Sequence, residues 1–328
     1  KMATILVSGG AGYVGSHACK ALRAVGHEPV VFDNFSTGWR GAVQFGAHVE
    51  GDLLNPEDLA KAFEAHRPDA VMHFAAFSNV GESVQKPELY WRNNVTGSLN
   101  LFTAAREAGV ETVVFSSTCA TYGEALGDTL TEGDPQIPVN PYGRTKLAVE
   151  HLLGDFNAAF GMRAVIFRYF NAAGADPERR IGEDHRPETH LIPLVLDAAS
   201  GRREKISIFG SDYPTPDGTC IRDYIHVDDL ASAHVLGLDW LLDGGAPLAL
   251  NLGTGSGYSV REVIDTARRV TQTDIPVEET GRRPGDPPQL VSGSALARET
   301  LGWEPTRSDL ATMIGDAWGW HQMPRYES

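Results

Sequence analysis

The sequence predicts an α/β fold, in which a doubly wound parallel sheet carries a smaller, interleaved α/β lobe. Two observations lead to this prediction. Short apolar runs alternate with amphipathic stretches through the first half of the 328-residue chain, which is the pattern of βαβ units. The first apolar run also ends in a cluster of glycines at residues 9–15, as a strand does when a tight turn leads into a helix.

The first half of the chain contains the predicted parallel sheet. Its apolar runs are short and bounded by turn residues, so we predict strands for them, and the amphipathic stretches between them predict helices. The predicted strands are residues 5–8, 29–33, 70–74, 110–116 and 163–169. The predicted helices are residues 12–25, 59–66, 94–108 and 142–160. Residues 1–172 are therefore expected to form the larger domain.

The pattern changes after Gly174. Residues 174–220 are rich in Pro, Gly, Arg, His and Asp, which predicts a loop-rich segment suited to ligand binding, with one helix near 192–200. Alternation resumes over residues 224–227, 230–241 and 248–252, and helices are expected over 258–272 and 292–321. We expect residues 221–252 to return to the larger domain and residues 173–328 otherwise to form the smaller lobe.

The composition limits the possible classes of function. A net charge of −15 gives no general attraction to nucleic acid or to an anionic membrane. The three cysteines, Cys19, Cys119 and Cys220, form no C-x-x-C pair, which argues against a disulfide framework or a cysteine zinc site. No apolar run has the length of a membrane span, and residues 1–4 lead directly into a strand. We therefore expect no signal peptide and a cytoplasmic protein.

The glycines at residues 9–15 form the first candidate binding site. Glycine allows a tight turn and lets backbone N–H groups at the positive end of the next helix approach a pyrophosphate, so the pattern predicts dinucleotide binding. Asp33 ends the second strand, where a carboxylate binds ribose hydroxyls and repels a 2′-phosphate. This favours NAD over NADP, and the alternative is a turn or cap aspartate. Asp52 either reaches the adenine or caps a helix.

Tyr142 and Lys146 form the candidate catalytic pair. They are four residues apart, and so they share one face of a helix. The lysine charge can stabilise a phenolate and lower the pKa of the tyrosine from about 10. The pair then provides a base for the proton of an alcohol. An exposed helix carries the same spacing by chance, so the pair gains its meaning from the rest of the chain.

We predict no metal site. His185, His190 and His226 do not have the spacing of metal ligands on a helix. Trp318, Trp320 and Cys119 are interpreted as packing residues.

Longer motifs connect these candidates with a known family. The motifs are residues 9–17, 33–38, 80–83, 93–95, 168–171, 217–227 and 301–305. Together with Ser116, Ser117, Thr118 and the Tyr142–Lys146 pair, they resemble the UDP-glucose 4-epimerase family of the extended short-chain dehydrogenase/reductase superfamily, over about residues 4–321. The resemblance implies a Rossmann-like fold, NAD as cofactor and a UDP-sugar as substrate. It also implies a homodimer formed through helices at residues 94–108 and 146–160.

The resemblance assigns roles residue by residue. The implied catalytic residues are Thr118, Tyr142 and Lys146. The implied cofactor-binding residues are Gly9, Gly12, Tyr13, Val14, Gly15, Asp33, Asn34, Ser36, Thr37, Gly38, Asp52, Leu53, Phe74, Ala75, Ala76, Asn93, Ser116, Tyr142, Lys146 and Tyr169. The implied substrate-binding residues are Thr118, Tyr142, Asn171, His190, Leu191, Phe209, Arg222, Arg283 and Asp286. Two arginines on separate loops suit a pyrophosphate, because a guanidinium group pairs bidentately with phosphate oxygens.

The implied reaction interconverts UDP-glucose and UDP-galactose through a transient 4-keto sugar. The same chemistry on UDP-xylose and UDP-L-arabinose stays open as an alternative. A nucleotide-sugar dehydratase is disfavoured, because Cys119 and Ala120 follow Thr118 where that class has an acid/base pair. A catalytically inactive NAD-sensing protein is disfavoured by the presence of both Tyr142 and Lys146.

Three residues depart from the family pattern or leave it open. Ser78 stands where some members have a lysine near the NAD pyrophosphate, and His190 stands where others have an asparagine beside the UDP. Leu290 occupies the position that helps to gate sugar size, so the acceptance of N-acetylated sugars is open.

Overall fold

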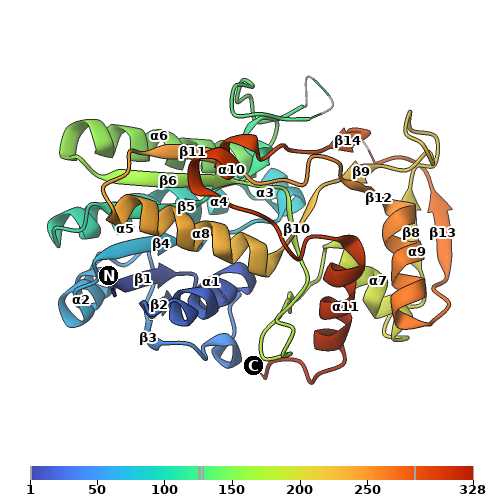
Figure 1. Cartoon of the computed structure of the whole chain (residues 1–328), viewed down its shortest axis with the longest axis horizontal. Coiled ribbons are helices and arrows are strands. Elements are labelled where there is room, and N and C mark those ends of the chain that lie inside the picture. Colours follow the sequence, from blue (N-terminus) through green and yellow to red (C-terminus); the bar gives the residue numbers. More distant parts are fainter. Residues whose placement is uncertain (1, 125–126, 128, 284–285, 328) are drawn as a thin grey trace.

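The computed structural model describes residues 2–124, 127, 129–283 and 286–327, and it shows the predicted α/β architecture (Figure 1). The strands of the large sheet are β1 (Thr4–Ser8), β2 (Glu28–Asp33), β3 (Ala47–Glu50), β4 (Ala70–His73), β5 (Thr112–Ser116), β6 (Arg163–Arg168) and β11 (Leu248–Asn251). Its main helices are α1 (Tyr13–Ala24), α2 (Pro56–His66), α5 (Gly97–Glu107), α6 (Pro141–Phe160) and α8 (Val227–Leu242). Shorter elements are η1 (Arg40–Ala42), α3 (Val80–Gln85), α4 (Pro87–Tyr90), the π-helical turn η2 (Trp91–Thr96) and η3 (Cys119–Thr121).

The seven strands of the large sheet follow the order β3-β2-β1-β4-β5-β6-β11, and every neighbouring pair is parallel. Parallel neighbours need crossover connections, which explains the alternation of strands and helices in the sequence. The order reverses between β1 and β4, as in a Rossmann-like sheet. The predicted doubly wound parallel sheet is confirmed.

Helices cover both faces of the large sheet. On one face α1 and α8 pack together, and their side chains share a core with Ile5 and Val7 of β1. On the other face α2, α5 and α6 share a second core with Leu6. Because both faces of β1 are buried, its sequence reads as a continuous apolar run. No helix in the described part of the chain combines the length and the apolar character that a membrane span requires.

The smaller lobe has its own core. It contains α7 (Leu191–Ala199), α9 (Val260–Thr271), α11 (Leu310–His321) and the parallel strands β8 (Ile206–Phe209) and β13 (Val277–Thr280), which Figure 1 shows together on the right. Two small sheets complete the fold. One pairs β7 (Asn171–Ala173) with β10 (Tyr224–His226), and the other has the order β12 (Tyr258–Ser259), β9 (Ile221–Arg222), β14 (Gln289–Leu290).

The structure differs from the sequence expectation in several elements, most of them in the second half of the chain. Residues 292–321 are not one helix, because α10 (Ala295–Leu301) ends at Gly302, which has a φ of +65°, and α11 begins only at Leu310. The strands β3, β8 and β13 were not predicted, and two of them, β3 and β13, are largely exposed and lack an apolar run. In addition, α10 and the buried Trp303 pack into the core of the large sheet, as α8 and β11 do.

The loops after β1 and β4 meet where the strand order reverses. Gly9 has a φ of +75°, and a Cβ atom on it would lie 2.5 Å from the amide nitrogen of Ala75. Gly15 lies in the first turn of α1, and a Cβ atom on it would lie 2.2 Å from the carbonyl oxygen of Gly9. Both positions therefore require glycine. The close approach places the start of α1 at the edge where doubly wound sheets bind ligands.

A buried ion pair fixes α6 to the large sheet. Arg168, at the end of β6, donates from Nη2 to Oε2 of Glu150 at 2.6 Å, and the two side chains are 8% and 4% exposed. Glu150 also accepts from Ser117, which follows β5, at 2.5 Å. Arg168 donates to the hydroxyl of Tyr122 at 2.9 Å, and that hydroxyl donates to Asn251 of β11 at 2.7 Å. One polar network thus joins α6 with the ends of three strands.

Gly15→Ala is expected to destabilise the protein by about 2–4 kcal/mol, because its methyl group would overlap the Gly9 carbonyl and force the turn and α1 apart. Urea denaturation measures this loss. Gly315→Ala in α11 is the control, since nothing lies within 4 Å of its added Cβ and alanine favours a helix interior by about 0.5–1 kcal/mol. Equal stability changes in the two variants would contradict the close approach.

Glu150→Gln is expected to lower the free energy of unfolding by about 3–5 kcal/mol, because it leaves the buried charge of Arg168 uncompensated. The matched control is Glu107→Gln, which removes an exposed partner of Arg106 and should cost no more than about 1 kcal/mol. Urea denaturation of both variants tests the comparison. A Glu150→Gln variant as stable as the control would show that the ion pair does not hold α6.

Candidate active site

The glycine turn presents backbone donors at the carboxyl edge of the large sheet. The helix α1 begins after Gly12, has no side-chain cap among the described residues and carries no acidic residue in its first turn. The first N–H groups of a helix have no partner within it, so those of Tyr13 and Val14 suit an anion at the positive helix end. The hydroxyl of Tyr13 donates to the carbonyl of Gly174 at 2.6 Å. This residue therefore offers its backbone, not its side chain, to a ligand.

Asp33, at the end of β2, holds the glycine turn in place. Its Oδ2 accepts from the backbone N–H of Ala11 at 3.0 Å and its Oδ1 accepts from that of Phe35 at 2.8 Å. Burial raises the pKa of this carboxyl group, and the two backbone hydrogen bonds oppose the rise. Each carboxylate oxygen has a second lone pair for a ribose hydroxyl, so the turn and cofactor interpretations are compatible. The loop after Asp33 contains Asn34, Ser36, Thr37 and Gly38.

Asn34 and Asp52 join the loops that follow β2 and β3. Nδ2 of Asn34 donates to Oδ2 of Asp52 at 3.2 Å, and Oδ1 of Asp52 accepts from the backbone N–H of Leu54 at 2.8 Å. The side chain that caps α2 is Asn55, so the interpretation of Asp52 as a helix cap is wrong. Leu53, the residue after Asp52, is buried. Because Asp52 does not cap α2, its carboxylate remains available for the adenosine end of a dinucleotide.

The loop after β4 lies beside the glycine turn. The backbone N–H groups of Phe74 and Ala75 both donate to the carbonyl of Ser8, at 2.9 and 3.1 Å, and Ala76 follows them. This arrangement pairs the ends of β1 and β4 past the sheet and leaves a narrow backbone wall at the crossover point. In doubly wound sheets this crossover point is where dinucleotides bind.

Asn94 is a functional candidate that the sequence analysis missed. Its buried amide accepts from the N–H of Phe77 at 2.9 Å and donates to the carbonyl of Phe77 at 3.0 Å and to Thr145 at 3.1 Å. It thereby ties the loop after β4 to α6. The predicted Asn93 donates to the Asn94 side chain at 3.0 Å. Asparagine is disfavoured inside helices without a side-chain partner, and its place in a helical stretch was the available signal.

The three predicted catalytic residues meet at the carboxyl end of β5. Thr118 follows β5, and its hydroxyl is near enough to the phenol of Tyr142 to oppose the rise in the pKa of that phenol. Asn140 caps α6, so Tyr142 lies in the first turn of this helix. Lys146 lies one turn further, and its buried Nζ donates to the carbonyl of Ser116 at 2.8 Å. The structure therefore brings a hydroxyl, a phenol and an amine to one point of the sheet edge.

Burial governs the proton equilibria of these groups. It raises the pKa of Tyr142, and the charge of Tyr169 adds to the rise while the Thr118 hydrogen bond opposes it. It lowers the pKa of Lys146 to about 7, against the charge of Glu150. The expectation that Lys146 lowers the pKa of Tyr142 is therefore not met by the chain alone, because desolvation disfavours both the phenolate and the ammonium. Ionisation of Tyr142 needs a further positive charge beside it.

Ser116 and Tyr169 complete this part of the site. The Ser116 hydroxyl and the Tyr169 hydroxyl are 2.6 Å apart and share a hydrogen bond. Burial raises the pKa of Tyr169 to about 12, so this phenol remains neutral near pH 7. It therefore lines the site as a neutral polar group that is hydrogen-bonded to Ser116.

The predicted nucleotide-binding residues of the smaller lobe form a second group. Arg222 Nη2 pairs with Oδ1 of Asp286 at 3.2 Å, and the guanidinium carbon of Arg283 lies 3.9 Å from the ring centre of Phe209. The backbone N–H of Asp286 donates to the carbonyl of Arg283 at 3.3 Å, which connects the two contacts. The side-chain amide of Asn171 donates to the backbone carbonyl of Asp223, the residue after Arg222, at 2.9 Å. Two guanidinium groups and an aromatic ring suit a pyrophosphate and a stacked base.

His190 and Leu191 are placed differently. His190 is the N-cap residue of α7, and Leu191 begins this helix. Nδ1 of His190 lies 2.5 Å from Oε1 of Glu183. The side chain and the backbone N–H of His190 are therefore both engaged by the loop before α7.

Comparison with known proteins gives the family. The model of the NAD dependent epimerase/dehydratase family matches residues 5–253. A UDP-glucose 4-epimerase of Rhizobium leguminosarum bv. trifolii is 53% identical over 318 residues, which cover 97% of each chain. A UDP-glucose 4-epimerase of Streptomyces lividans is also 53% identical, over 96% of this chain and 95% of the other.

Solved structures agree with this comparison. The UDP-glucose 4-epimerase from Brucella ovis in complex with NAD superimposes with a TM-score of 0.95 at 51% identity, over 97% of this chain and 98% of the other. The UDP-glucose-4-epimerase from Stenotrophomonas maltophila, with bound NAD and formylated UDP-arabinopyranose, gives a TM-score of 0.94 at 40% identity over 98% of each chain. The prediction drawn from the motifs is confirmed: the chain belongs to the NAD-dependent epimerase/dehydratase family and, within it, to the UDP-glucose 4-epimerases.

Proposed function

We propose that this protein is an NAD-dependent isomerase that interconverts UDP-glucose and UDP-galactose through a transient 4-keto sugar. The observation that carries the proposal is the convergence of Thr118, Tyr142 and Lys146, whose Nζ donates to the carbonyl of Ser116 at 2.8 Å, at the sheet edge that also carries the glycine turn. The 53% identity with curated UDP-glucose 4-epimerases over nearly the whole chain supports the reaction class.

The residues at the sheet edge fit a bound NAD. The glycine turn carries no side chain at residues 9, 10 and 12, and a Cβ atom on Gly12 would lie 3.3 Å from the carbonyl oxygen of Gly9. The helix α1 begins there without an acidic residue in its first turn. These residues would hold the pyrophosphate, and Asp33 and Asp52 would hold the adenosine. The loop residues 74–76, with Asn93, Ser116, Lys146 and Tyr169, would surround the nicotinamide half. When bound, NAD supplies the acceptor for a hydride from carbon 4 and the donor that returns it.

Tyr142 acts as the proton acceptor in this proposal. As a phenolate it takes the proton of the sugar's 4-hydroxyl while carbon 4 loses its hydride, and as a phenol it returns the proton when the hydride comes back. Thr118 holds the 4-oxygen through the same hydroxyl that contacts Tyr142. Because burial raises the pKa of Tyr142, its ionisation depends on Lys146 together with the positive charge of a bound oxidised nicotinamide.

The nucleotide must remain anchored while the sugar turns. Arg222, Arg283 and Phe209 hold the pyrophosphate and the uracil in this proposal, with Asp286 fixing Arg222. The sugar itself is held loosely, so the 4-keto intermediate can rotate about its link to the pyrophosphate and present its other face. The returning hydride then inverts the configuration at carbon 4.

Two alternatives are weighed against specific residues. Dehydration requires an acid/base pair after Thr118, but Cys119 is fully buried and burial raises the pKa of its thiol further. UDP-xylose and UDP-L-arabinose remain competing substrates, because inversion at carbon 4 does not involve carbon 6. Leu290 is the register partner of Arg222, and this pairing supports a role for Leu290 as a size gate beside the proposed nucleotide anchor.

We also propose a cytoplasmic homodimer that uses α5 and α6. Leu99 on α5 is 42% exposed and Phe160 at the end of α6 is 44% exposed, and both are large apolar side chains on the predicted interface helices. The three cysteines are free and buried, in keeping with a reducing compartment.

Tyr142→Phe tests the catalytic assignment. It should lower kcat at least about 1,000-fold, because it removes the proton acceptor, and it should leave the NAD content and the melting temperature unchanged. Product formation from UDP-galactose and from UDP-L-arabinose, measured side by side, reports activity and sugar preference together. The control is Tyr326→Phe, whose hydroxyl contacts the backbone of Gly182 away from the sheet edge. Near wild-type turnover in Tyr142→Phe would refute the role of Tyr142.

Lys146→Met tests the charge balance. Loss of the ammonium should raise the pKa of Tyr142 further, so the acidic limb of the kcat–pH profile should move upward by about one pH unit or more. NAD retention after gel filtration should fall as well. Lys61→Met, at an exposed position of α2, should change neither measurement. An unshifted profile would show that the bound cofactor alone sets the ionisation of Tyr142.

A further inference from the structure

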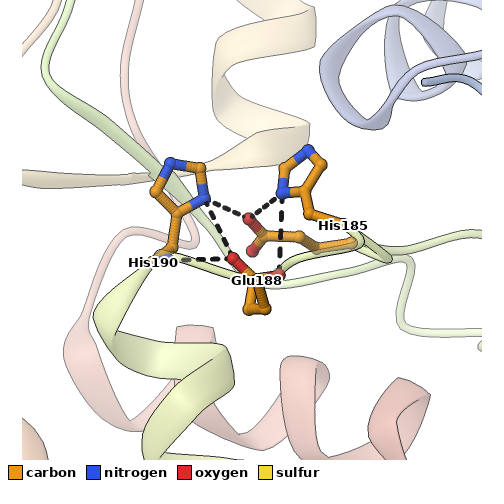
Figure 2. A group of neighbouring side chains, drawn as sticks. His185, Glu188 and His190 are labelled. Carbon is orange, nitrogen blue, oxygen red and sulfur yellow. Dashed lines mark hydrogen bonds and ion pairs between the residues drawn. The ribbon is translucent and has the colours of Figure 1, made fainter. Parts of the chain in front are cut away.

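A group of two histidines and two glutamates lies in the loop before α7. Glu183, His185, Glu188 and His190 each offer one ligand atom, and these atoms all lie within 4.8 Å of one another. Figure 2 shows the rings of His185 and His190 standing on opposite sides with Glu188 between them. Both histidines direct the same atom, Nδ1, toward the carboxylates.

The four side chains are spaced like the ligands of one ion. Nδ1 of His185 lies 3.1 Å from Glu183 and 3.6 Å from Glu188, and Nδ1 of His190 lies 2.5 Å from Glu183 and 3.6 Å from Glu188. Tetrahedral ligands about 2.0–2.2 Å from a zinc ion are separated from one another by about 3.3–3.6 Å. The separations of His185 Nδ1 from Oε1 of Glu183 and from Oε2 of Glu188 lie near this range. His190 Nδ1 lies 2.5 Å from Oε1 of Glu183 and 3.6 Å from the other oxygen of Glu188, Oε1, so His190 would move outward to complete the set.

Both carboxylates are buried and fixed. The side chains of Glu183 and Glu188 are 6% and 9% exposed. Oε1 of Glu188 accepts from the backbone N–H groups of Thr189 and His190 at 2.7 and 2.8 Å, which leaves Oε2 facing His185. The indole N–H of Trp320 donates to the carbonyl of Glu183 at 3.0 Å and steadies its backbone. Ligands held by such outer contacts are typical of metal sites.

The charges require a compensating cation or its equivalent. Two buried carboxylates are costly without two positive charges nearby. Two neutral imidazoles and one divalent cation balance them, and so do two protonated imidazoles without a metal. Of the common divalent cations, zinc prefers a mixture of imidazole nitrogen and carboxylate oxygen in four-fold coordination, whereas Mg²⁺ prefers oxygen alone. The ligand set therefore selects zinc-like cations.

A small cavity lies beside the group. It has a volume of about 20 Å³ and is lined by Glu183, His185 and Glu188 together with Asp197 and His321, which is room for about one water molecule or one small ion. The prediction of no metal site rested on helical spacing, and it did not consider a loop that turns four ligands inward.

We propose that Glu183, His185, Glu188 and His190 bind one zinc-class divalent cation. The ion would fix the loop before α7 in relation to the glycine turn, because the ring of His185 packs edge-on against that of Tyr13 at 6.3 Å between centroids. Tyr13 also holds Gly174, where this loop begins. The cation is a structural link between the two halves of the chain, and it takes no part in the proton transfer at Tyr142.

The first test measures metal content without any assay of turnover, so its result is independent of the proposed function. Protein without a histidine tag is stripped with EDTA, incubated with Zn²⁺ or with Mg²⁺, passed through a desalting column and analysed by mass spectrometry of the metal. About one zinc and no magnesium should be retained per chain. Zn²⁺ at about 100 times its Kd should raise the melting temperature by about 5 °C.

The second test uses matched variants. His185→Ala and Glu188→Gln should each weaken zinc binding at least about 100-fold, whereas His151→Ala, at an exposed position of α6, should retain one zinc. Cobalt substitution of the wild-type protein keeps the proposal testable if a variant fails to fold. Four-coordinate Co²⁺ should give visible d–d bands without a sulfur charge-transfer band, since the three cysteines are not ligands.

Three results would overturn the proposal. Loss of zinc from the wild-type protein on desalting, with no change in melting temperature, would show that two protons occupy the group. Equal zinc in the wild type and in His185→Ala would indicate an adventitious ion only. A sulfur charge-transfer band with Co²⁺ would place the metal at a cysteine instead.

Discussion

The buried ion pair between Glu150 and Arg168 is the interaction on which the candidate site depends. Tyr142, Lys146 and Glu150 are spaced four residues apart and so form one row along α6. Because Arg168 ends β6, its contact with Glu150 fixes both the rotation and the axial position of the helix. The first turn of α6 then brings Tyr142 to Thr118. Buried ion pairs add little net stability, and here the pair determines where a helix face points.

The same row of side chains explains why Tyr142, the proposed base, stays protonated when no cofactor is bound. Burial lowers the pKa of Lys146 to about 7 and raises that of Tyr142, so neither group is readily ionised near neutral pH. The carboxylate of Glu150, one turn further along α6, raises the pKa of Lys146 and so favours its charged form, but it cannot promote the ionisation of Tyr142. In the proposed mechanism, the binding of a positively charged cofactor half is therefore the event that makes Tyr142 a base. A site built in this way would hold its base in the neutral form until the oxidant is in place.

The sequence predicted most of what lies in the large sheet and less of what lies outside it. Runs such as residues 5–8 were recognisable because both faces are buried, whereas β3 is largely exposed and β8 and β13 belong to a small lobe sheet. The end of α10 at Gly302 had a signal in the sequence, a glycine followed three residues later by Pro305, which the prediction of one helix over residues 292–321 overlooked. Of the site, the arrangement of Tyr142 and Lys146 followed from helical spacing. The raised pKa of Tyr142 and the convergence of His185 and His190 did not, because both depend on burial and on loop geometry.

The position of β11 in the large sheet has a consequence for synthesis of the chain. This strand pairs with β6, but the loop-rich segment, α7, β8 and α8 come between them in the sequence. While the chain emerges from the ribosome, β6 is therefore an open edge that could pair with another chain. Its two terminal residues are Arg163 and Arg168, and charge at the ends of an edge strand discourages such pairing. The arginine that anchors α6 in the folded protein therefore also disfavours pairing of this sheet edge with another chain until β11 has been synthesised.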